Sequence, residues 1–172
     1  ALIAYAQAFV NENLPASSAK NLLDSALWDL KAGITHTSVN CLINLPEVTY
    51  AVSAQTLSVD SIDIMVANAK TMAHLPLIKI KLDSADIVAK MQAIHKACPN
   101  SKFIIDANEA WSFAALHDVV NPLANLNVAV IEQPLPAGED DELIGFSSPI
   151  PLCADESCHT SANISLLATK YS

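Results

Sequence analysis

Short apolar segments recur along most of this chain, roughly every 25 residues, and each precedes a segment with helical periodicity. This alternation predicts an α/β fold with a parallel sheet, because parallel strands need long helical crossovers between them. The expected strands span residues 49–59, 77–82, 102–107, 128–133 and 151–156, and the expected helices span 61–74, 84–97, 112–122, 140–145 and 161–170.

Two architectures fit the alternation, an open doubly wound sheet and a (β/α) barrel. The first strand–helix turn lacks a G-x-G-x-x-G motif, and the chain holds only three glycines, so a nucleotide-binding doubly wound sheet has little support. Polar residues end four consecutive strands, which favours a barrel, where all strand ends face one mouth. A complete barrel needs about eight strand–helix units, so the sequence predicts a partial TIM-type barrel.

The expected domain boundary lies near residue 48. Residues 1–48 are predicted to be a helical segment that leads into the barrel, with helices at 2–13 and 17–32 and a cap at Ser17 or Ser18. Residues 49–172 are predicted to be the first five βα units. Because five strands leave open edges and an exposed apolar interior, we expect that the chain is incomplete or that a partner closes the barrel.

Three acidic residues end consecutive strands: Asp106 in IIDANEAW, Glu132 in VIEQPLP and Asp155 in LCADES. Three oxygen ligands that converge on one mouth suit Mg²⁺. Each acid also has an ordinary explanation, as a helix cap, a surface residue or the partner of a lysine, respectively. Their shared register favours a metal site, which also removes the cost of burying charges after apolar strands.

The preceding strand, LIKIKL, presents Lys79 and Lys81 on one face, since residues i and i+2 of a strand point the same way. Two ammonium groups close together near a divalent cation disfavour each other's charged form, and a neutral lysine is a general base near pH 7. From K-x-K alone, two solvated lysines are the better interpretation. Their position one strand before three carboxylates favours a site that removes a proton from carbon.

Other polar residues near the strand ends have more than one interpretation. Asn108 and Gln133 are candidates to orient ligands or to contact substrate. Glu156 is a candidate partner of either lysine, or else faces the helices. Thr56 either lines the pocket or is an ordinary strand residue, and Trp111 either walls the pocket or packs at a helix start.

Composition excludes several classes of function. The net charge of −9 and a pI near 4.7 argue against nucleic acid or an anionic membrane as partner. All basic residues are Lys, so no guanidinium clamps a carboxylate. The four cysteines lack metal-site spacing and are expected to be buried thiols. The N-terminal segment lacks a basic region and a cleavage motif and is too polar for a membrane span, so we expect no signal peptide and a cytoplasmic location.

The motifs K-x-K, D-A-N-E-A-W, E-Q-P and A-D-E-S together resemble the enolase superfamily, and more narrowly its muconate-lactonizing subgroup. Within that subgroup the chain is most similar to dipeptide epimerases of the L-Ala-D/L-Glu kind. The resemblance implies a (β/α) barrel whose N-terminal capping domain is largely absent from this chain. It also implies a dipeptide substrate and suggests a homo-oligomer.

The same resemblance implies a role for the three acids and the two lysines. Asp106, Glu132 and Asp155 would bind Mg²⁺, Lys81 would be one of two catalytic bases, and Lys79 would stabilise the enediolate beside the substrate carboxylate. Thr56 and Asn108 are expected to contribute to substrate binding from their positions near the strand ends, and the resemblance adds nothing to their assignment. The opposing lysine of the family follows a sixth strand, which Lys170 does not match, so these residues alone are expected to be inactive.

Two alternatives stay open. Other enzymes of the subgroup, namely o-succinylbenzoate synthase, muconate cycloisomerase and N-acylamino acid racemase, would use the same ligands. A non-catalytic half-barrel that retains the motifs by descent would bind no Mg²⁺.

Overall fold

The computed structural model describes residues 2–171, which divide into two compact units, the first up to residue 51 and the second from residue 52 onward. The first unit is helical, with α1 (Leu2–Asn13), α2 (Ser18–Thr35) and the short α3 (Val39–Leu42). Ser17 caps α2, because its side chain accepts a hydrogen bond from the Lys20 N–H. The expected helices at 2–13 and 17–32 are therefore present, and α3 lies in a segment that showed no periodicity.

The second unit contains a five-stranded parallel sheet in the order β1-β2-β3-β4-β5. Each strand pairs with the strand that follows it along the chain. The strands are β1 (Gln55–Leu57), β2 (Leu77–Lys81), β3 (Lys102–Asp106), β4 (Val128–Glu132) and β5 (Leu152–Cys153).

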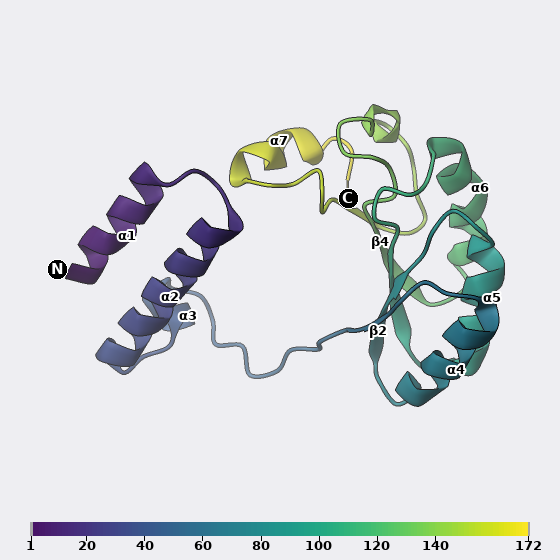
Figure 1. The fold of residues 1–172 in the computed structure, drawn as a ribbon, viewed down its shortest axis with the longest axis horizontal. Helices are drawn as coiled ribbons and strands as arrows, with labels where there is room; N and C mark the ends of the chain where they lie inside the picture. Colours follow the sequence, from purple (N-terminus) through teal and green to yellow (C-terminus); the bar gives the residue numbers. More distant parts are fainter. Residues whose placement is uncertain (1, 172) are drawn as a thin grey trace. The chain divides into compact units, whose positions relative to one another are not determined.

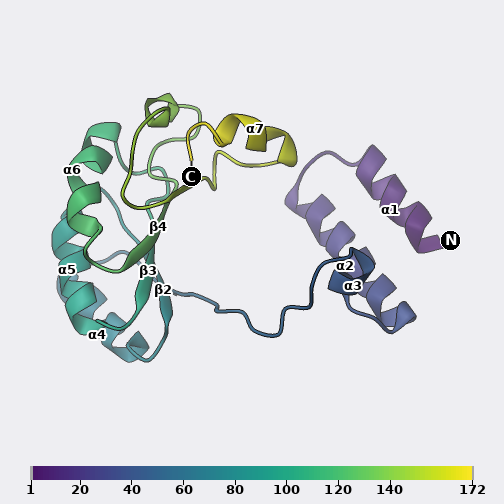
Figure 2. The same ribbon diagram turned by 180° about the vertical axis from the view of Figure 1, so that it is seen from behind.

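Three helices connect the first four strands, and all of them cover the same face of the sheet (Figures 1 and 2). A doubly wound sheet reverses its strand order and carries helices on both faces, whereas sequential strands with right-handed crossovers place every helix on one face. The arrangement is therefore that of consecutive units of a (β/α) barrel, as predicted. The helices are α4 (Ile62–Met72), α5 (Ile87–Ala97) and α6 (Phe113–Leu123).

The hydrophobic core lies between the sheet and these helices. Alternate strand residues point into it, as the burial of Ile78 and Ile80 on either side of half-exposed Lys79 shows. The opposite face carries Lys79 beside its lateral neighbour Ile104, which in turn pairs with Val130, so polar and apolar residues share that face. The fully buried core residues include Met65, Met91, Ile94, Phe103, Ile105, Leu116, Leu123 and Ile131.

Several elements are shorter than the sequence indicated. The expected strand 49–59 is only β1, three residues long, and the expected helix 140–145 is the 3₁₀ turn η1 (Asp141–Leu143). The expected helix 161–170 consists of η2 (Ser161–Asn163) and α7 (Ile164–Leu167). Apolar composition alone predicted longer elements, but backbone pairing limits a strand to the residues that meet a neighbour.

All four cysteines are free, but the expectation of buried thiols is correct only for Cys98. Cys41, Cys153 and Cys158 are exposed, because they lie in a short helix, at a strand end and in a loop rather than under the helices. None of the helices within residues 2–171 is both long and apolar enough to cross a membrane.

Candidate functional site

A row of polar side chains crosses the ends of β2, β3 and β4. Lys81 is the lateral neighbour of Asp106, and Asp106 is the lateral neighbour of Glu132. The row continues to Cys153 on β5. Because these positions are in register, the sequence-predicted base and two of the predicted ligands lie side by side at the carboxyl ends of the strands, where barrel enzymes carry their active sites.

Lys79 joins the two carboxylates of this row. Its Nζ lies 2.9 Å from Asp106 Oδ2 and 2.9 Å from Glu132 Oε1. The Asp106 side chain is only 2% exposed, so its charge is expensive to bury without a partner. The ammonium of Lys79 is that partner. It lies within 2.9 Å of an oxygen of each acid, so one positive charge contacts both carboxylates.

The pKa of Lys79 lies above its ordinary value. Burial is the strongest single influence and acts to lower the pKa, but the hydrogen bonds to Glu132 and Asp106, together with the negative charges of these two groups, outweigh it. This direction is opposite to the one expected from two adjacent ammonium groups. The two carboxylates, which the lysine-pair argument did not weigh, explain the difference.

Lys81 belongs to a second chain of contacts. Its Nζ donates to Asn108 Oδ1 at 2.6 Å and lies 3.5 Å from Asp106 Oδ2. Asn108 Nδ2 in turn donates to Glu156 Oε1 at 3.1 Å, while Glu156 Oε2 is buried without a hydrogen-bond partner. Glu156 thus reaches Lys81 through an amide, rather than by the direct pairing considered from the sequence.

Asp155 is exposed, in the segment that follows β5. Within residues 2–171, no three His, Cys, Asp or Glu side chains are grouped closely enough to hold a metal ion. The structure therefore brings Asp106 and Glu132 together with Lys79 but does not add Asp155 to that group. The assignment of all three acids as metal ligands stays a prediction.

The remaining residues that the sequence suggested for the site differ in their exposure to solvent. Thr56 is exposed and is the lateral neighbour of Lys79, so it lies on the strand face that carries the lysines. Trp111 is 1% exposed, and its indole N–H donates to the Asp83 carbonyl, so it is a packed aromatic. Gln133 is completely buried, which excludes contact with substrate.

A buried polar cluster that no sequence pattern indicated consists of Gln133, Asp140, Ser157, Lys170 and Tyr171. Asp140 is 1% exposed and accepts hydrogen bonds of 2.7 Å from Ser157 Oγ, Lys170 Nζ and Tyr171 Oη. Burial acts to raise the pKa of Asp140, but these hydrogen bonds outweigh it and hold the pKa below the usual range. No local sequence pattern predicts the cluster, because its members come from three segments that are distant in sequence.

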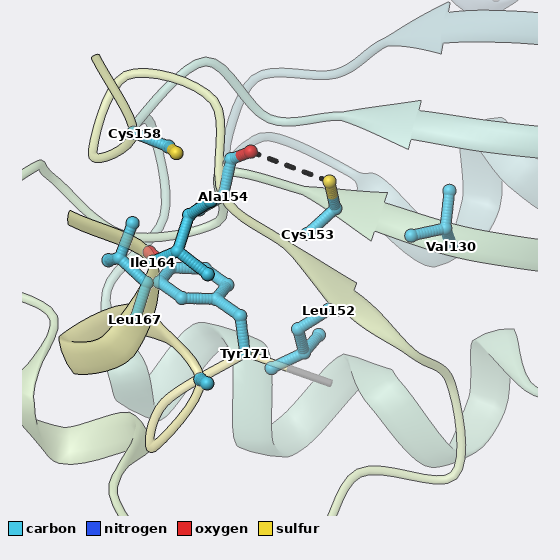
Figure 3. A pocket seen from close by; sticks show the side chains of 9 residues that line it. Val130, Leu152, Cys153, Ala154, Cys158, Ile164, Leu167 and Tyr171 are labelled. Carbon is cyan, nitrogen blue, oxygen red and sulfur yellow. Dashed lines mark hydrogen bonds between the residues drawn. The ribbon is translucent and has the colours of Figure 1, made fainter. Parts of the chain in front are cut away.

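A cavity of about 390 Å³ lies beside β4 and β5, and Figure 3 shows the side chains that line it. Leu152, Leu167 and Tyr171 make it apolar, and Cys153 Sγ donates to the Ala154 carbonyl at 3.4 Å. None of the three predicted ligand carboxylates lines this cavity. It adjoins the polar row only through Cys153, so we do not identify it with the candidate site.

Comparison with known proteins identifies the fold family. The sequence model of the enolase C-terminal domain-like family matches residues 64–170, more than half of the chain. The chain belongs to the enolase C-terminal domain-like family. The match spans β2 to β5 and so contains the whole row of Lys81, Asp106 and Glu132.

Two curated relatives and one solved structure are especially similar. N-acetyl-D-glutamate racemase of a Pseudoalteromonas species is 49% identical, over 92% of this chain and 50% of its own. L-Ala-D/L-Glu epimerase of Escherichia coli K12 is 43% identical, over the same shares. An Agrobacterium tumefaciens enolase family member with homology to dipeptide epimerases, solved with sodium and L-Ala-L-Glu, is 34% identical, with a TM-score of 0.87 over 96% of this chain and 51% of that one. The chain spans about half the length of these relatives.

Proposed function

We propose that this chain carries the proton-abstracting half of an epimerase that acts at the α-carbon of an N-acylated glutamate, with the dipeptide L-Ala-L/D-Glu as its leading substrate. The observation that carries the proposal is the row at the strand ends, in which Lys81 stands next to Asp106 and Glu132 on one face of the sheet. The two similar proteins are named as a racemase of N-acetyl-D-glutamate and an epimerase of L-Ala-D/L-Glu, so both names describe a change of configuration in a glutamate derivative.

Lys81 is the proposed base. The Nζ of Lys81 donates to Asn108, and the Lys81 side chain is 42% exposed, so the lysine is both oriented and open to a bound molecule. Proton abstraction needs the neutral amine, and proton return needs the ammonium, so one lysine serves one face of the α-carbon. Lys170 is not the second base, because it is 7% exposed and paired with Asp140 and Asp141.

The proposed cofactor is Mg²⁺, held by Asp106, Glu132 and Asp155. The donor types fit, since all three groups are hard carboxylates, and Asp106 and Glu132 already share one cation, the ammonium of Lys79. Asp155 lies in the segment after β5 and would have to join these two acids when the metal binds. When bound, the metal would supply positive charge that stabilises the substrate carboxylate as the α-proton leaves. Lys79 adds a second positive charge at the same edge, and Thr56 and Asn108 are the proposed substrate contacts.

The test is exchange of the substrate α-proton in D₂O, followed by proton NMR, with the intact protein that contains this chain and with Mg²⁺ present. We expect L-Ala-L-Glu to exchange, and Lys81→Ala to lower the exchange rate from one face at least about a hundredfold, as loss of a general base does. Lys102→Ala is the matched control, because Lys102 is an exposed lysine at the opposite end of the neighbouring strand. Unchanged exchange in Lys81→Ala would overturn the proposal.

A second substrate is favoured by one observation, the 49% identity to N-acetyl-D-glutamate racemase. In N-acetylglutamate and in L-Ala-Glu, the glutamate nitrogen is acylated, so both α-carbons present the same reacting group. The ratio of kcat/KM for the two compounds distinguishes them. Exchange of neither compound, with no Mg²⁺ bound in calorimetry, would instead favour a non-catalytic half-barrel.

A further inference from the structure

The polar cluster around Gln133 joins three segments of the second unit. Gln133 directly follows β4, Ser157 lies in the segment after β5, and Tyr171 follows α7. Asp140 accepts hydrogen bonds from both hydroxyl groups through its Oδ2 atom, at 2.7 Å each. The cluster thus connects the segment that carries Asp155 to the end of the neighbouring strand.

The amide of Gln133 has one orientation only. Its Oε1 accepts from the backbone N–H groups of Asp155 at 2.9 Å and Ser157 at 3.0 Å, which can only donate. Its Nε2 donates to the Leu135 carbonyl at 2.8 Å, which can only accept. Because both ends face groups of fixed polarity, a flipped amide would lose every one of these bonds.

The backbone of Gln133 is also constrained. Its φ of 38° lies in the left-handed region of backbone conformation, which residues other than glycine rarely adopt. The residue is held there by its N–H, which donates to the Cys153 carbonyl, and by its own carbonyl, which accepts from the Glu109 N–H. Strained backbone persists where its surroundings over-determine it, and such positions gather at functional sites.

We propose that Gln133, anchored to Asp140 through Ser157 and Tyr171, is a positioning residue that fixes the segment bearing Asp155 beside Glu132. The consequence for cation binding rests on the proposed function, whereas the positioning of the segment does not. Two backbone N–H groups of the segment 155–157 donate hydrogen bonds to the buried Oε1 of Gln133. The Gln133 side chain therefore determines the direction in which the segment leaves β5. With the backbone of this segment held, the Asp155 side chain has only its own rotation left to adjust toward a cation, and outer partners commonly orient metal ligands in this way.

Two variants of the intact protein test this. Gln133→Met keeps a long, unbranched side chain but removes every hydrogen bond of the amide. Ser157→Ala removes one of the two hydroxyl groups that link the amide to Asp140 and leaves that of Tyr171 in place. Ser101→Ala is the matched control, because Ser101 is completely buried and donates to the Leu75 carbonyl at 2.7 Å, just before β3 and away from the strand ends that carry the acids.

Hydrogen exchange by mass spectrometry is measured for the peptide that contains Asp155 and Ser157. We expect exchange to rise about tenfold in Gln133→Met, because two amide N–H groups lose their acceptor, and to rise less in Ser157→Ala. The dissociation constant for Mn²⁺, measured by electron paramagnetic resonance, should rise about 10- to 100-fold in Gln133→Met. Ser101→Ala should lower the melting temperature without changing either quantity.

Unchanged exchange of this peptide in a folded Gln133→Met protein would overturn the inference. If that variant does not fold, equal exchange in Ser157→Ala and Ser101→Ala would overturn it. Exchange that rises while Mn²⁺ affinity stays at the level of the control would reject a role for the segment in cation binding. A wild-type protein that binds no Mn²⁺ would refute the metal site of the proposed function, and the exchange result would still decide the positioning role.

Discussion

The charged residues at the strand ends are arranged so that each buried carboxylate has a cationic or hydrogen-bonding partner. Asp106 is compensated by Lys79 and Lys81, and its Oδ1 accepts from the Asn108 N–H at 3.1 Å. Strand alternation is a local property, so Lys79, Lys81, Asp106 and Glu132 could be identified as neighbours from the sequence. The ion pair of Lys79 with Glu132 spans two strands and could not, because it depends on side-chain reach.

Asp140 provides a test of the buried cluster through pH. Its pKa is lowered in the folded protein, so its contribution to stability is present above the unfolded value of about 3.9 and is lost as pH falls through the folded value. At pH 7 we expect Asp140→Asn to reduce the free energy of unfolding by about 2 kcal/mol, since hydrogen bonds to a charged group are lost. Below about pH 4 the difference between variant and wild type should shrink.

Urea unfolding followed by circular dichroism between pH 7 and pH 3 measures this difference. Asp118→Asn is the control, because the Asp118 side chain is 82% exposed. A difference between Asp140→Asn and wild type that stays constant down to pH 3 would contradict the assigned ion pair.

The two faces of strand β2 carry residues with different roles, one in the hydrophobic core and the other in the candidate site. Ile78 and Ile80 are completely buried against the helices, while Lys79 and Lys81 occupy the face that bears the acids. The alternation in LIKIKL predicted this division correctly. The lengths of β1 and of the elements after residue 140 were not predicted, because they depend on which backbone groups meet a partner.

Substitutions at neighbouring positions of β2 should therefore affect different properties, one the stability of the protein and the other its activity. We expect Ile80→Ala to lower the free energy of unfolding by about 2–5 kcal/mol, because it leaves a cavity in the core. Lys81→Ala should cost about 1 kcal/mol or less, since its ion pair is half-exposed, yet it should abolish α-proton exchange from one face. Urea unfolding and the exchange assay on the same preparations measure both effects, and a Lys81→Ala protein as unstable as Ile80→Ala would contradict this division.

The two compact units give the whole molecule separate sources of stability. The first unit has one buried residue among residues 2–51, Val10, whereas the second holds a continuous core. A cation at the predicted site would bind only the second unit. Its effect on stability should therefore appear in the unfolding of residues 52–172.

Mg²⁺ should raise the melting temperature of the intact protein, and EDTA should reverse the change. At a hundredfold excess over the dissociation constant, mass action predicts about 2.7 kcal/mol of stabilisation. Asp155→Asn should abolish most of this gain, while Asp118→Asn should keep it. Scanning calorimetry with and without Mg²⁺ provides the measurement, and an equal gain in Asp155→Asn would remove that residue from the ligand set.

The sequence by itself determined the α/β class, the order of the strands and the face on which Lys81, Asp106 and Glu132 lie, because periodicity of two and the spacing of strand ends are properties of consecutive residues. Only the tertiary structure decided that Lys79 bridges two acids, that Asp155 stands apart from them, and that Gln133 is a buried anchor. These features depend on distances between segments far apart in the chain, which no local pattern encodes. The sequence thus identified the candidate chemistry, and the fold decided which side chains meet.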